Sequence, residues 1–206
     1  TRRPIRPEVD AAITARAVKT ARALPQGVLP MFTLTRITAP AATPITLEEA
    51  RAQLRVDHED EDLLIQHYID AATAWLDGPA GILGRCLVTQ NWQMGLDAVT
   101  GPILLPFPDS EIDSAVFTDA EGGELIHELE LQDQRPLLRP ITGLGRSAAI
   151  TFTAGYGAPA DVPAAIRQAM LLLVTQWYEY RQVTGAGAAL PFAVEALLAP
   201  YRRVRL

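Results

Sequence analysis

Three histidines and one cysteine are the side chains of this 206-residue chain best suited to catalysis or metal binding. His58, His67 and His127 are scattered along the sequence and match no known metal-ligand spacing. Cys86 begins an apolar, strand-like stretch, where a cysteine usually acts as a small buried hydrophobe. A single cysteine forms no disulfide within the chain and supports no cysteine-rich metal or redox site.

The most charged segment is the acidic run from Asp57 to Asp62. A calcium loop needs a glycine at its turn, and this run contains none. A long helical pattern follows directly, and carboxylates stabilise a helix N-terminus. We therefore predict a helix start here. The glycine-rich stretch Gly143–Ser147 lacks the phosphate-loop lysine pattern and precedes a strand, so it is interpreted as a turn. Overall, the sequence predicts no catalytic, cofactor-binding or metal-binding residue.

Composition narrows the function further. The chain is 49% apolar and 20% charged, as is usual for a soluble globular protein, and its formal net charge is -6. A general nucleic-acid binder is normally basic, and a membrane helix needs roughly 18–20 apolar residues in a row, so neither is predicted. The positive charge gathers at the two ends, within residues 1–30 and in the last six residues, a pattern typical of interaction arms.

Helical patterns flank a region of strand patterns. Thr46 and Glu49 form a capping box that predicts a helix to about Arg55. A second helix is predicted from Asp57 and a third from Asp161, with Pro163 in its first turn. Trp75, Leu173 and Trp177 are predicted in their shared core, and a short helix at 192–198 follows. The boundaries assigned are 1–30 for a basic N-terminal arm, 31–44 for a linker, 45–84 for N-terminal helices, 85–157 for a β insertion, 158–199 for C-terminal helices and 200–206 for a basic C-terminal tail.

The central region has the two-residue period of β-strands. Alternate residues from Val88 to Leu96 are mostly apolar, and strands are also predicted at 103–105 and 148–154. The segments 112–117 and 124–131 read as a hairpin around the turn Asp119–Gly123. The order of helices, strands and helices predicts an α+β fold, in which N- and C-terminal helices pack together around an inserted small antiparallel sheet or sandwich.

Several segments, in this order, resemble the head–tail connector (adaptor) proteins of tailed bacteriophages and gene transfer agents. The resemblance covers about residues 45–205 and is carried by Ile45-Thr46-Leu47-Glu48-Glu49-Ala50, Leu54-Arg55-Val56-Asp57, Asp60-Glu61-Asp62, Leu87-Val88-Thr89-Gln90-Asn91-Trp92, Thr153-Ala154-Gly155-Tyr156-Gly157, Val162-Pro163, Ala169-Met170-Leu171-Leu172-Leu173, Trp177-Tyr178-Glu179 and the ending from Leu197 to Arg205.

The resemblance implies a structural protein rather than an enzyme. Such adaptors form a ring, commonly of about twelve copies, which lies under the portal, extends the DNA channel and links capsid to tail. The implied partners are the portal protein, neighbouring copies, a tail-side stopper or tail terminator protein, and DNA that passes without sequence-specific binding. The implied location is the head–tail junction of a virion or phage-like particle assembled in the bacterial cytoplasm. An acidic body suits such a channel because negative walls repel phosphate.

The C-terminal segment of such adaptors tends to reach towards the portal. The residues expected to bind the portal are therefore Tyr201, Arg202, Arg203, Val204, Arg205 and Leu206. Tyrosine and arginine are enriched among interface residues that contribute most to binding, although a basic end can also simply be solvated. Two other functions stay open. One is a small soluble α+β ligand-binding domain or enzyme, in which His127, Glu128 or Cys86 would converge; the other is a nucleic-acid accessory protein that uses the basic N-terminal arm.

Overall fold

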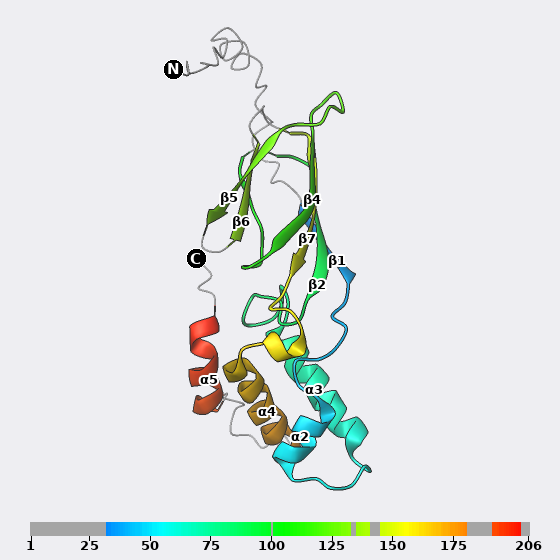
Figure 1. Cartoon of the computed structure of the whole chain (residues 1–206), viewed down its shortest axis with the longest axis vertical. Helices are drawn as coiled ribbons and strands as arrows, with labels where there is room; N and C mark the ends of the chain where they lie inside the picture. The colour runs from blue at the N-terminus through cyan, green and yellow to red at the C-terminus, as the bar shows by residue number, and fades with distance from the viewer. Residues whose placement is uncertain (1–31, 100, 133–134, 141–144, 181–190, 203–206) are drawn as a thin grey trace, which may run out of the picture.

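Two separate groups of buried apolar side chains organise the fold, one between helices and one between two β-sheets. The computed structural model describes residues 32–99, 101–132, 135–140, 145–180 and 191–202. The molecule is elongated, with the sheets at one end and the helices at the other (Figure 1). The predicted α+β class is confirmed. The N-terminal arm at 1–30, the first two residues of the predicted turn at 143–147 and the tail residues Arg203–Leu206 lie outside the described ranges.

The helical part contains four helices among the residues that the structure describes. They are α2 (Leu47–Leu54), α3 (Asp62–Leu76), α4 (Ala164–Glu179) and α5 (Phe192–Leu198), with short 3-10 turns η2 (Pro159–Asp161) and η3 (Ala199–Tyr201). Helix α4 contacts each of the other three. The predicted core is confirmed here: Leu173 is buried, and Trp75 and Trp177 pack against the same cluster while remaining partly exposed. Among the helices that the structure describes, none is long and apolar enough to cross a membrane.

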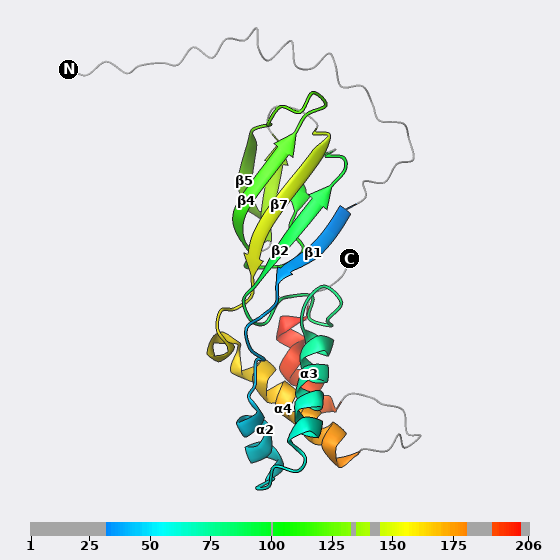
Figure 2. The same ribbon diagram turned by 90° about the vertical axis from the view of Figure 1, so that its right-hand side faces the viewer.

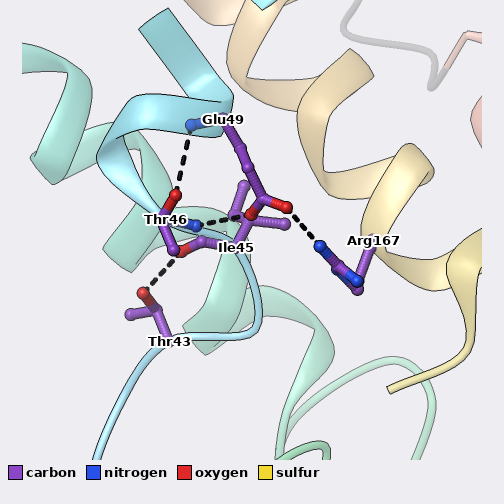
Figure 3. Close-up of polar contacts among 5 residues, drawn as sticks. All are labelled: Thr43, Ile45, Thr46, Glu49 and Arg167. Atoms are coloured by element: carbon purple, nitrogen blue, oxygen red, sulfur yellow. Dashed lines mark hydrogen bonds and ion pairs between the residues drawn. The ribbon is translucent and has the colours of Figure 1, made fainter. Parts of the chain in front are cut away.

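The predicted capping box begins α2 as expected. The Glu49 amide donates to the Thr46 hydroxyl at 3.2 Å, and the Thr46 amide donates to the Glu49 carboxylate at 2.8 Å. The second carboxylate oxygen of Glu49 accepts from the Arg167 guanidinium of α4, so the cap also ties α2 to α4 (Figure 3). Just before the cap, the Thr43 hydroxyl donates to the Ile45 carbonyl at 2.7 Å and shapes the approach of the chain to the helix.

Replacing Thr46 with alanine should lower the free energy of unfolding by about 1–2 kcal/mol, because the Glu49 amide loses its acceptor and the carboxylate is held less firmly for Arg167. Urea denaturation followed by circular dichroism would measure the change. Thr46→Ser keeps the hydroxyl and should remain within about 0.5 kcal/mol of the wild type. Equal losses in the two variants would contradict the capping role of this hydroxyl.

Most of the acidic run lies before α3, with Glu61 at the N-cap and only Asp62 in the first turn, so the predicted helix start at Asp57 was wrong. Arg55 adopts a left-handed conformation with φ 59° that closes α2, and the helix resumes only at Asp62. Asp62 accepts a hydrogen bond from Arg51 at 3.4 Å, which fixes the later start. The buried face of α3 consists of Ile65, Ile69, Ala72 and Leu76, whereas Leu63 is 80% exposed.

Within the described ranges, seven antiparallel strands form two sheets packed face to face. The strands are β1 (Phe32–Thr38), β2 (Gln90–Leu96), β3 (Ile103–Leu104), β4 (Glu111–Thr118), β5 (His127–Gln132), β6 (Arg135–Pro140) and β7 (Ser147–Ala154). One sheet has the order β1-β2-β7-β4 and the other β3-β6-β5. The predicted alternation in β2 is confirmed, since Gln90, Trp92 and Met94 are all buried. Trp92, Phe107, Phe117 and Phe152 belong to the core between the sheets.

Two strand predictions need correction. Residues 31–44 were expected to be a linker, but Phe32–Thr38 form β1, which pairs with β2 and places Leu34 against the sandwich core. The predicted hairpin around Asp119–Gly123 closes only at its turn, where Asp119 accepts from the Glu121 and Gly123 amides. Beyond the turn the two segments separate, because β4 pairs with β7 and β5 pairs with β6 in the other sheet.

Candidate functional site

The C-terminal segment is held by its own chain up to Tyr201. Val194 and Leu198 of α5 are fully buried in the helical core, and Tyr201 packs partly buried against the same cluster. The Arg202 amide donates to the Leu198 carbonyl at 3.1 Å, while the Arg202 residue itself is exposed. Of the two predicted portal-binding residues that the structure describes, Tyr201 therefore anchors the segment and Arg202 is available to a partner.

The segment ends beside the connection between helices and sheets. Helix α5 lies against α4, and its C-terminal end faces the sheets (Figure 1). Burial raises the pKa of Tyr156, and both Tyr156 and Tyr201 pack partly buried against the helical core cluster. The Arg85 guanidinium donates to the Tyr156 hydroxyl and lies 5.6 Å from its ring centroid.

Side chains and close backbone contacts fix the helical and β parts relative to each other. The Asp77 carboxylate, just after α3, accepts from the Leu87 amide at 2.7 Å and from the Gln90 side-chain amide at 3.0 Å. Gln90 is 1% exposed, so these bonds supply buried donors with an acceptor. The Thr89 amide donates to the Gly157 carbonyl at 2.9 Å, which joins the segment entering β2 to the segment leaving β7. We infer that these contacts form a rigid junction between the helical part and the β part.

The structure does not bring the possible catalytic residues together. The ring centroids of His127 and Phe117 are 4.9 Å apart, and Phe117 pairs with Ala148 near the start of β7. Cys86 lies near Gly155, just after the other end of β7. That length of strand separates them by about 20 Å. Burial raises the pKa of the Cys86 thiol to about 12, so it stays protonated and inert, as the prediction of a buried hydrophobe requires. No group of metal-binding side chains occurs in the part of the chain that the structure describes.

Exposed apolar side chains occur at several separate places on the described part of the protein. In the β part the exposed residues are Phe32, Ile37, Val116, Ile126, Leu129 and Leu131; in the helical part they are Leu63, Tyr180 and Phe192. Leu129 and Leu131 share one face of β5, but they are 56% and 76% exposed because β5 is at the edge of the three-stranded sheet. Large exposed apolar patches usually mark binding surfaces.

Comparison with known families supports the predicted resemblance. Residues 44–107, which include α2, α3 and β2, match the family described as phage gp6-like head-tail connector protein. No curated protein matches the chain.

Solved structures with a similar fold come from gene transfer agent (GTA) particles. A chain from the neck of an empty GTA particle, computed with C6 symmetry, is 28% identical with a TM-score of 0.66. A chain from the virion of a native GTA particle is 28% identical with a TM-score of 0.67, and one from the neck of a native GTA particle, computed with C12 symmetry, is 26% identical with a TM-score of 0.62. Each match covers 84% of this chain and 97% of the other. The resemblance to head–tail connector proteins is thereby confirmed.

Proposed function

We propose that this chain is a structural adaptor at the head–tail junction of a tailed phage or gene-transfer-agent particle, where it forms a ring under the portal. The observation that carries the proposal is the 28% identity to a chain from a GTA neck, over 84% of this sequence and both of its parts. The family matched by residues 44–107 is a connector family and not an enzyme family. The proposed mechanism is therefore assembly: the protein acts through its shape and through the surfaces that bind neighbouring proteins.

A ring of about twelve copies fits a fold of this kind. The related necks have cyclic symmetry, and copies in a closed ring meet through two different surfaces, one on each side of the protomer. The rigid junction around Asp77 and Gln90 would keep the helical and β parts of every copy at one angle. Neighbouring copies are thus the first partners that we propose.

DNA passing through the ring would meet an acidic surface. Exposed carboxylates gather at the α2–α3 end of the molecule, at Glu48, Asp57, Glu59 and Asp60. Negative charge repels the phosphate backbone, so DNA can slide past without sequence-specific binding. We propose that this end lines the channel that the ring extends.

The C-terminal tail is the proposed portal contact, and a stopper or tail terminator protein is the proposed partner on the tail side. Tyr201 is anchored in the helical core, so the chain that follows starts from a fixed point. Arg202 is exposed there, and the sequence adds Arg203 and Arg205. Arginine forms strong paired hydrogen bonds with carboxylates, so an acidic surface on the portal would fit this tail.

Ending the chain after Tyr201 tests the portal contact. Because the truncated protein retains Tyr201 and every other described residue of the helical core, it should keep its thermal midpoint within about 2 °C. Its amount in purified particles should fall at least about tenfold, as expected when about 1.4 kcal/mol or more of binding is lost. Quantitative mass spectrometry of the particles would measure this ratio.

A matched control keeps the length of the tail. In it, Val204→Ala alone is changed, and incorporation should remain within about twofold of wild type, since one small apolar truncation costs little at a mainly charged contact. Wild-type incorporation of the truncated chain would contradict the portal role of the tail while leaving the place of the protein in the particle intact. Absence of the wild-type chain from particles would contradict the proposed function itself.

A further inference from the structure

The β-sandwich has two unlike edges on opposite sides. In the four-stranded sheet β1 is one edge strand, and β4 is the other. In the three-stranded sheet β5 is an edge strand on the β4 side, since the turn 119–123 joins β4 to the segment leading into β5. Figure 2 shows β1 and β5 on opposite sides of the sandwich. Among the described residues, no strand pairs with the outer edge of either one.

The β1 side carries an apolar groove. A cavity of about 350 Å³ lies between the start of β1 and the segment around β3, and its lining includes Phe32, Leu96, Val99, Pro102 and Ile103. Phe32 is 63% exposed and Ile37 is 55% exposed on the same strand. Arg36 is the one ionisable residue of β1, so the strand itself carries a single positive charge.

The β5 side carries apolar side chains between carboxylates. Leu129 and Leu131 lie on one face of the strand, and Ile126 just before it is 64% exposed. Glu128 and Glu130 alternate with the leucines, and only Glu130 has an ion-pair partner among the described residues, Arg139 at 3.3 Å. This side is therefore apolar and acidic.

The β5 edge of one copy is more complementary in charge to the β1 edge of another copy than either edge is to a second copy of itself. Pairing two β5 edges would set Glu128 and Glu130 against their own copies, and pairing two β1 edges would set Arg36 against Arg36. Like charges placed opposite each other destabilise a strand pair, whereas opposite charges stabilise it. An exposed apolar strand edge is also a template for pairing with another chain, so both edges require a cover. Unlike faces on opposite sides of one protomer are what a closed ring needs.

We propose that the β5 edge of one copy packs against the β1 edge and the adjoining groove of the next copy, with Leu129 and Leu131 directed towards Phe32. This inference rests on the proposed function, because it identifies the lateral contact of the proposed ring. The occupant of the groove is a second copy of this chain, chosen for its complementary charge and for the cyclic symmetry of the related necks.

Cross-linking of a double variant tests the contact directly. The full chain carrying Phe32→Cys and Leu131→Cys is produced in the cell that assembles the particles, and purified particles are treated with a short bis-maleimide. If the two edges meet between copies, every chain links to two neighbours, and denaturing gels should show a ladder of trimers and larger species. Either single variant has one reactive site, so it can form nothing beyond a dimer. Native Cys86 is 3% exposed and contributes no background.

The control pair is Phe32→Cys with Leu63→Cys. Leu63 is 80% exposed, close to the 76% of Leu131, but it lies in the first turn of α3 in the helical part. This pair should yield no species beyond a dimer. A ladder from the control pair but not from the edge pair would overturn the proposal, as would particles that contain the edge-pair variant at wild-type level and give no ladder. The second result would also fit a groove filled by residues 1–31 of the same chain.

A charge variant gives an independent readout. Leu129→Glu with Leu131→Glu adds carboxylates to exposed positions and should leave the thermal midpoint of the isolated protein unchanged. Its incorporation into particles should fall at least tenfold, whereas Leu63→Glu should incorporate as wild type. Normal incorporation of the double variant would overturn the lateral contact while leaving the head–tail role of the protein standing. Only absence of the wild-type chain from particles would count against that role.

Discussion

Changing Gly155 to alanine should destabilise the protein by about 3 kcal/mol or more. Gly155 follows β7 with φ +132°, a conformation that is essentially restricted to glycine. An added Cβ would stand 2.6 Å from the carbonyl carbon and oxygen of Val88, and these are backbone atoms that cannot rotate away. Either β7 or the segment entering β2 would have to shift. That shift would disturb the hydrogen bond from the Tyr156 amide to the Leu87 carbonyl, now 3.0 Å.

Gly95→Ala is the matched control. Gly95 lies within β2, and a Cβ added there would meet no atom within 4 Å, so alanine should change stability by less than about 1 kcal/mol and can even stabilise. Urea denaturation of both variants gives the comparison. If Gly155→Ala unfolds at the same urea concentration as Gly95→Ala, the close approach of the two backbones at the junction is wrong.

The elements that the sequence predicted well are those fixed by local chemistry. The capping box at Thr46 and Glu49 involves residues three positions apart, so their side chains can satisfy the backbone without help from the rest of the fold. The alternation around Trp92 likewise follows from burial of one strand face. Cys86 was placed correctly because its apolar neighbours indicate burial.

The elements that were missed depend on distant partners. Phe32–Thr38 looks like a linker because only Leu34 reaches the core, and the strand is defined by pairing with β2, about sixty residues later. The segment after Asp119–Gly123 looks like a hairpin arm, yet β5 finds a better partner in β6. Such choices are made by competition between sheets, which periodicity alone does not reveal.

The two candidate interfaces differ in the same way, since one follows from the local sequence and the other depends on the sheet topology. The C-terminal tail was proposed as an interface from its tyrosine and arginines together with the family resemblance, and that interface stays a prediction. The β5 edge could not be proposed in this way, because Leu129 and Leu131 alternate with glutamates just as they would in a strand that buries its leucines. Their exposure follows from the position of β5 at the rim of its sheet. A surface strand with a core-like pattern is therefore a signal of assembly that requires the topology to be known.

Changing Phe152 to alanine should lower the free energy of unfolding by about 3–5 kcal/mol. Phe152 is fully buried at the centre of β7, where it pairs with Trp92 on one side and Ile112 on the other. Its ring lies 6.2 Å from that of Phe107, which in turn lies 5.4 Å from Trp92. Removing it opens a cavity that strands paired on both sides cannot collapse to fill. Urea denaturation followed by tryptophan fluorescence would measure the loss.

Phe192→Ala is the matched control, because it removes the same atoms from a side chain that is 85% exposed. It should change stability by less than about 0.5 kcal/mol. The fluorescence also reports where the loss acts: Trp92 lies in the sandwich core, whereas Trp75 and Trp177 pack against the helical core. Since Asp77 and Gly155 couple the two parts at the junction, we expect all three tryptophans to unfold together in the Phe152 variant. The contrary result would be that Trp92 reports earlier unfolding of the sandwich while Trp75 and Trp177 keep their wild-type midpoint. It would contradict a rigid junction and the idea that each copy acts as one stiff unit of the ring.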